Sequence, residues 1–139
     1  MKRINLILFI ILTSSLLVYC SDEVKFENLP DPAVDYLAQH MHDTRILEIA
    51  FHEGKYEVDL ANGSEFEFNE NGKIQSIEND EQGIRANYLP RKINLYLIKN
   101  HPQNYVIKWS REDRYQRVRL DNQMVLVFNK NNEFILSLD

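Results

Sequence analysis

Three acidic residues of this 139-residue chain are each matched by a basic residue 60 positions later. The pairs are Glu48 and Lys108, Glu57 and Arg117, and Asp59 and Arg119. If these residues occupy outward positions of strands, they offer a surface whose two halves have opposite charge. Such a surface can orient a charged partner. Ordinary solvation of exposed strands, with drift after a duplication, explains the same pattern, and the sequence leaves both interpretations open.

Other residue types give little support to catalysis or metal binding. His40 and His42 would point about 200° apart on a helix, whereas a metal site needs converging ligands. Glu65 and Glu67 lie on one exposed strand face, but acid–base catalysis needs a cleft that shifts a pKa. The sequence has no serine in a nucleophile elbow and no glycine-rich phosphate loop. We therefore predict that the protein is not an enzyme and uses no cofactor and no metal.

Basic and aromatic residues between positions 105 and 119 are superficially similar to a nucleic-acid patch. The formal net charge of the chain is −5, and phosphate binding needs a basic footprint. We therefore predict no nucleic-acid partner. Trp109 and Tyr105 share the strand parity of Ile107, so we expect both aromatic side chains in the core.

The elements that position these residues follow from an internal similarity with a constant offset of 60 residues and no gap. Residues 29–79 hold 11 acidic and 3 basic side chains, whereas residues 80–139 hold 7 and 10. The two copies therefore share a pattern and differ in charge. The matched positions are Leu29 and Leu89, Pro30 and Pro90, Tyr36 and Tyr96, Val58 and Val118, Leu60 and Leu120, and Phe68 and Phe128.

Each copy is predicted to begin with a helix, because proline suits the first helical turn and apolar residues follow at helical spacing. Four strands follow, since apolar and polar residues then alternate and Asn62-Gly63 and Asn71-Gly72 are turn signals. The predicted fold class is α+β. It consists of two tandem repeats, each a helix followed by a four-stranded antiparallel meander, with the helices packed on one face of the combined sheet.

The first residues have the features of a targeting segment. Lys2 and Arg3 precede an interrupted apolar run that ends at Cys20, the one cysteine of the sequence. We predict a signal peptide over residues 1–19, a tether over 20–27, and one domain over 28–139 made of repeats 28–79 and 88–139. The segment before Cys20 resembles a bacterial lipobox, in which the cysteine is lipidated; ordinary cleavage after Cys20 is the alternative.

Several motifs of the first copy resemble the PepSY-like, beta-lactamase-inhibitor-like family of bacterial envelope proteins. They are Leu29-Pro30, Tyr56-Glu57-Val58-Asp59-Leu60, Asn62-Gly63, Phe66-Glu67-Phe68 and Asn69-Glu70-Asn71-Gly72. The resemblance covers both copies and implies two helix-plus-sheet units whose sheets join into one curved surface, with the helices behind. Gln123 and Asn132 replace glycine in the second copy, which leaves the geometry of its turns less defined.

These observations predict a non-catalytic, lipid-anchored binding protein of the bacterial cell envelope, periplasmic or on the outer membrane. It would reach the membrane only through its lipid and bind a protein partner with its exposed sheet face, and the family name suggests inhibition of a hydrolase or peptidase. The alternative is a small-ligand or metal-sensing module of an envelope signalling or stress pathway; the oligomeric state stays open. The predicted partner-binding residues are Glu57, Asp59, Glu65, Glu67, Lys108, Arg117 and Arg119.

We predict that Cys20 is the lipidated first residue of the mature protein, because a lone cysteine stands at the signal boundary. Mass spectrometry of the native protein should find an N-terminal cysteine with attached acyl chains. An unmodified N-terminus at Ser21 would contradict the prediction.

Overall fold

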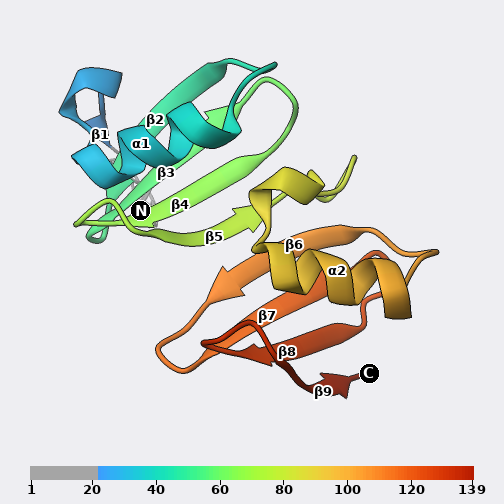
Figure 1. Cartoon of the computed structure of the whole chain (residues 1–139). Coiled ribbons are helices and arrows are strands. Elements are labelled where there is room, and N and C mark those ends of the chain that lie inside the picture. Colours follow the sequence, from blue (N-terminus) through green and yellow to red (C-terminus); the bar gives the residue numbers. More distant parts are fainter. Residues whose placement is uncertain (1–21) are drawn as a thin grey trace, which may run out of the picture.

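One antiparallel sheet dominates the computed structural model, which describes residues 22–139. Its nine strands follow chain order from β1 to β9 (Figure 1). Two α-helices, α1 (Asp31–His40) and α2 (Arg91–Asn100), and two short 3-10 helices, Phe26–Asn28 and Ala86–Tyr88, accompany the sheet. The strands are β1 (Asp22–Glu23), β2 (Ile46–His52), β3 (Lys55–Leu60), β4 (Glu65–Asn69), β5 (Ile74–Glu78), β6 (Val106–Arg111), β7 (Tyr115–Leu120), β8 (Val125–Asn129) and β9 (Phe134–Leu138).

The predicted fold class was wrong. Instead of two repeated helix-plus-four-strand units, the described residues form a single nine-stranded sheet with only two α-helices, so the fold is sheet-dominated. Strand β5 pairs directly with β6, and β1 adds a ninth strand beside β2. Two four-stranded meanders side by side would leave unpaired N–H and C=O groups along their facing edges. Pairing β5 with β6 satisfies two of those edges.

The hydrophobic core lies between the sheet and the two helices, which cover the same face in Figure 1. Helix α1 buries Ala33 and Leu37, and α2 buries Ile93 and Leu97. The strands contribute alternate residues, as the period of two requires. The largest of these buried strand side chains are Leu60, Phe66, Phe68, Ile77, Trp109, Leu120, Leu126 and Phe128.

The hairpin predicted from Asn62-Gly63 is confirmed, because β3 and β4 pair around it. Gly63 has a φ of +82°, and the Asn62 side chain accepts a hydrogen bond from the Ser64 N–H at 3.0 Å. In the second half, Gln123 and Asn132 adopt φ of 72° and 64°. These turns therefore keep the left-handed geometry without glycine.

Two bulges change which side chains face the core. The ladder shifts register between Ile46 and Glu48 in β2, and again between Val106 and Lys108 in β6. An extra residue in one strand reverses the parity of the residues before it. The expectation of a core Tyr105 was therefore wrong, since 48% of it is exposed, whereas the buried position of Trp109 is confirmed at 1%.

The predicted signal peptide and Cys20 lie outside the described residues. Within the segment expected to be a tether, Asp22–Glu23 form β1 and pair with Phe51 and Ala50 of β2. Neither α-helix within residues 22–139 has the length and apolar character needed to span a membrane.

We expect Phe68→Ala and Phe128→Ala each to lower the free energy of unfolding by about 3–5 kcal/mol, because both rings are completely buried. Urea denaturation followed by circular dichroism measures the change. Leu95→Ala on the exposed side of α2 is the control and should change stability by less than about 0.5 kcal/mol. A loss below about 1 kcal/mol for both phenylalanines would contradict their place in the core.

Candidate partner-binding face

All seven residues predicted to contact a partner lie on the sheet face opposite the helices, which we call the open face. Cross-strand pairing arranges them in two rows that run across the sheet. One row is Glu48, Asp59, Glu65, Glu78, Lys108, Arg119, Val125 and Leu138. The second row is Ala50, Glu57, Glu67, Ser76, Ser110, Arg117, Val127 and Leu136.

The open face therefore has three zones in strand order. Acidic side chains occupy β2 to β5, basic side chains occupy β6 and β7, and aliphatic side chains occupy β8 and β9. Directly opposed residues on neighbouring strands have Cβ atoms only about 5 Å apart, so each zone is continuous across its strands. The register, which the sequence alone does not give, brings the zones together.

The acidic and basic zones meet at Glu78, which the sequence analysis did not single out. Its carboxylate receives Lys108 Nζ at 2.5 Å and Arg119 Nη2 at 3.1 Å. Asp80 lies 3.8 Å from the same Arg119 nitrogen. Glu78 was missed because the 60-residue offset pairs it with Leu138 and not with a basic residue. Glu78 could have been found from the alternation of its strand, which places it on the outward face beside Ile77, a core residue.

Three more of the predicted residues contact a side chain of a basic or acidic residue. Glu57 lies 3.3 Å from His52 Nε2, and Glu67 lies 2.9 Å from Lys55 Nζ. Arg117 Nε lies 3.3 Å from Glu112. Partly exposed pairs of this kind contribute about 0–1 kcal/mol each. They can therefore be exchanged for contacts with a partner at small cost.

Asp59 and Glu65 form no ion pair with any of residues 22–139. The two carboxylates stand directly opposite each other on β3 and β4. Burial raises the pKa of Glu65, and the neighbouring charges of Asp59, Glu57 and Glu78 raise it further; Lys108 opposes this rise. This is the part of the open face where like charges are least compensated.

The histidines do not converge. The ring of His40 stacks on Tyr36 with centroids 4.1 Å apart, and its Nδ1 hydrogen-bonds to the Tyr36 carbonyl oxygen at 2.8 Å. His42 lies exposed beyond the end of α1. Within residues 22–139, no group of three or more His, Cys, Asp or Glu side chains could hold a metal ion.

The aliphatic zone includes an edge strand. Every residue of β9 is exposed, and Leu136 and Leu138 retain 42% and 50% of their accessible surface. Both face the same side as Val125 and Val127 of β8. Edge strands of soluble proteins normally carry protecting charges, and β9 itself carries none. The aliphatic zone therefore leaves apolar surface exposed at one edge of the sheet.

Solved structures with the same fold come from Bacteroides. A "putative calcium-regulated periplasmic protein" of Bacteroides thetaiotaomicron aligns with a TM-score of 0.77 at 22% identity, over 86% of this chain and 97% of its own. A "putative periplasmic protein" of Bacteroides vulgatus aligns with a TM-score of 0.75 at 19% identity, over 88% and 99% of the two chains. Another from the same species, "of unknown function", has a TM-score of 0.74 at 22% identity, over 86% and 100%.

No curated protein matches the chain significantly. A family model does match, twice, over residues 18–76 and 54–136. Its two matches together cover most of the sequence, including every strand of the open face except the last residues of β9. The chain belongs to the PepSY-like family described as "Putative beta-lactamase-inhibitor-like".

Proposed function

We propose that this protein is a non-catalytic binding protein of the bacterial cell envelope whose open face binds a protein partner. The observation that supports this most is the register of the open face. It places an acidic zone, in which Asp59 and Glu65 have no ion pair among residues 22–139, next to a basic zone and an apolar zone. A partner surface with the complementary order of basic, acidic and apolar groups would fit it in one orientation.

The acidic zone costs stability in the isolated protein. Glu57 stands opposite Glu67, and Asp59 stands opposite Glu65. Like charges directly opposite each other on neighbouring strands destabilise a sheet. Lysine or arginine side chains of a partner would offset this repulsion, so the same residues that weaken the free fold favour the complex.

The basic and apolar zones supply the remaining contacts. The Arg117 side chain keeps 53% of its accessible surface, and Lys108 and Arg119 keep 39% and 36% although both contact Glu78. Such half-exposed charges steer association more than they add affinity. The aliphatic side chains of β8 and β9 would add apolar contact area, since burial of apolar surface favours association.

The envelope location is supported by the Bacteroides proteins of the same fold, each of which is described as a "putative" periplasmic protein. Lipidation of Cys20, at the end of the basic and apolar N-terminal segment, would tether the sheet domain to a membrane. The family description suggests the partner class, a hydrolase or peptidase that the bound open face would inhibit by covering its active site.

Glu65→Gln should stabilise the protein at neutral pH by about 0.2–1 kcal/mol, because it removes one charge from an opposed like-charge pair. The raised pKa of Glu65 means that the folded state holds this proton more tightly than the unfolded state. Wild-type stability therefore falls as pH rises from the ordinary value of 4.5 through the raised pKa. The advantage of Glu65→Gln should shrink below pH 4.5.

Urea denaturation at a series of pH values measures this difference between the two proteins. Glu70→Gln is the matched control, because Glu70 is an exposed residue of the following turn. If both variants have the same stability as wild type at neutral pH, the acidic zone carries no net repulsion.

Asp59→Lys combined with Glu65→Lys should slow association with the partner at least tenfold and reverse the salt dependence of the association rate. The partner is first captured with the immobilised domain from an extract of the organism's own envelope. Surface plasmon resonance at several ionic strengths then gives the rates. Folding stability should change little, because the two opposed lysines repel each other as Asp59 and Glu65 do but are attracted by Glu48 and Glu78 in the same row.

The matched control is Glu70→Lys combined with Glu81→Lys, which makes the same charge change at exposed turn residues outside the strands of the open face. Wild-type association rates for the Asp59 and Glu65 variant at every ionic strength would show that the open face is only a solvated surface. Equal slowing by both double variants would show that total charge, and not the open face, matters.

A further inference from the structure

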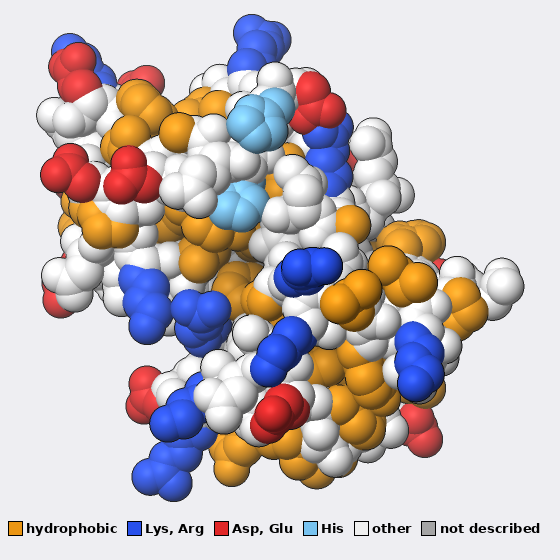
Figure 2. All heavy atoms as spheres, viewed as in Figure 1, with side chains coloured by type: hydrophobic (Ala, Val, Ile, Leu, Met, Phe, Trp, Pro, Cys, Tyr) orange, Lys and Arg blue, Asp and Glu red, His pale blue; other side chains and the backbone are white. Residues whose placement is uncertain are grey.

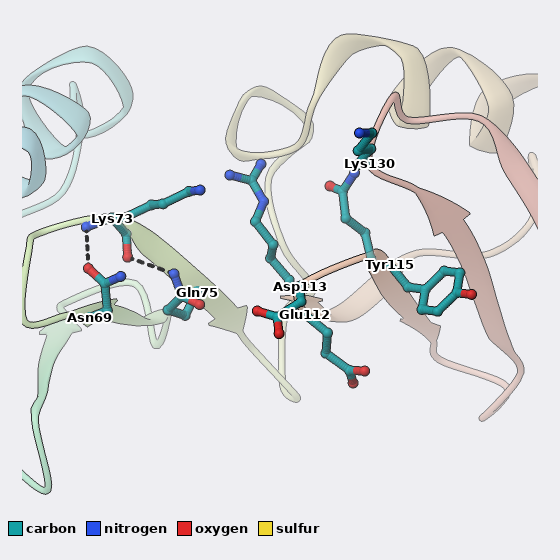
Figure 3. A pocket seen from close by; sticks show the side chains of 9 residues that line it. Asn69, Lys73, Gln75, Glu112, Asp113, Tyr115 and Lys130 are labelled. Atoms are coloured by element: carbon teal, nitrogen blue, oxygen red, sulfur yellow. Dashed lines mark hydrogen bonds between the residues drawn. The ribbon is translucent and has the colours of Figure 1, made fainter.

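A cleft opens on the helix side of the sheet where β5 and β6 stop pairing. Their ladder ends at the pair Ser76 and Ser110, and beyond it the two strands diverge (Figure 1). The cleft has a volume of about 440 Å³ and is lined mainly by polar residues from the turns on either side (Figure 3). The seven predicted partner-binding residues do not line it, although Glu112 of its lining contacts Arg117 of the open face.

Three cations from separate segments line this cleft. Lys73 belongs to the β4–β5 turn, Arg111 ends β6, and Lys130 belongs to the β8–β9 turn. None lies within 4.0 Å of a carboxylate of the described residues. Figure 3 shows Lys73 extending from one side of the cleft toward the other, and Figure 2 shows Lys and Arg side chains gathered where the two halves meet.

Two carboxylates also line the cleft, but they do not balance these cations. Glu112 is occupied by Arg117 at 3.3 Å. Asp113 is an exposed residue of the β6–β7 turn. The cleft therefore has an excess of positive charge that the protein itself does not neutralise.

The Arg111 side chain packs on the buried Trp109 ring. Its guanidinium carbon lies 5.3 Å from the centroid of the buried Trp109 ring, a cation–π contact. Trp109 Nε1 donates a hydrogen bond to Gln116 Oε1 at 3.1 Å. Gln116 Nε2 in turn donates to the Asn129 carbonyl at 3.0 Å and to Asn132 Oδ1 at 2.6 Å. A satisfied buried network of this kind fixes the floor of the cleft before any ligand arrives.

The internal sequence similarity does not account for the three cations. Sixty residues away, Lys73 is matched by Glu133, Arg111 by Phe51 and Lys130 by Glu70. The positive cleft is therefore a feature of the complete sheet, at the one place where the two halves meet.

We propose that this cleft binds a small molecule that carries a phosphate or several carboxylate groups. A guanidinium can grip either oxyanion with two parallel hydrogen bonds, while the lysines add charge from both sides. The volume suits a small ligand, since ligand sites commonly measure about 300–1,000 Å³. This inference goes beyond the proposed function, because it concerns a small ligand and not a protein partner.

The test uses the fluorescence of Trp109, the one tryptophan of the chain, which lies directly under Arg111. Inorganic phosphate and citrate are titrated separately into the domain at constant ionic strength, with sodium chloride as the reference salt. A saturable change with phosphate, citrate or both supports the site and distinguishes the two ligand classes. No saturable change with either, or the same change with sodium chloride, would overturn it.

Two sets of variants locate the binding. Arg111→Gln should weaken it at least tenfold, and so should Lys73→Gln combined with Lys130→Gln, which leaves the Trp109 contact intact. Arg114→Gln removes an exposed charge from the same turn as Asp113 and does not line the cleft, so it should bind as wild type does. Isothermal titration calorimetry supplies the affinities independently of fluorescence. Equal weakening by Arg114→Gln would show non-specific screening and refute the cleft as the site.

Discussion

The short ladder between β5 and β6 is the interaction on which the rest of the structure depends. Only the segment from Ser76 to Glu78 pairs with Lys108 to Ser110. On one side of this ladder, Ile77 and Trp109 join the buried core. On its other side, Glu78 binds Lys108 and Arg119. Backbone pairing, apolar burial and ionic contact therefore occur together at the β5–β6 ladder. The nine strands form one sheet because these two strands pair.

The same ladder borders two surfaces of different character. On the open face it brings the acidic zone against the basic zone, and Glu78 is the residue at the boundary. Beyond the last pair of the ladder, Ser76 and Ser110, β5 and β6 diverge. The polar cleft between them is lined by Lys73, Arg111 and Lys130. A long, extended surface suits a protein partner, whereas a cationic cleft suits a small anion.

Two features of the sheet lower the stability or solubility of the protein. Opposed carboxylates on β3 and β4 and the unprotected apolar edge at β9 both depart from what stability and solubility favour. Departures of this kind in an otherwise consistent structure are expected at functional surfaces. In the acidic zone the effect on the free energy of unfolding can be measured. Because the pKa of Glu65 is raised, its contribution lowers stability as the pH rises toward neutral.

The sequence by itself determined the local elements. Prolines at the helix starts, alternation in the strands and the Asn62-Gly63 turn are short-range constraints, and the structure places α1, α2 and the β3–β4 hairpin where they predict. The outward position of the seven charged residues followed from the same alternation. Only the tertiary structure decided the pairing of β5 with β6, the ninth strand, the bulges that expose Tyr105, the contacts of Glu78 and the cleft at Arg111. These depend on which strand edges pair across a long sequence separation, and local periodicity carries no information about that choice.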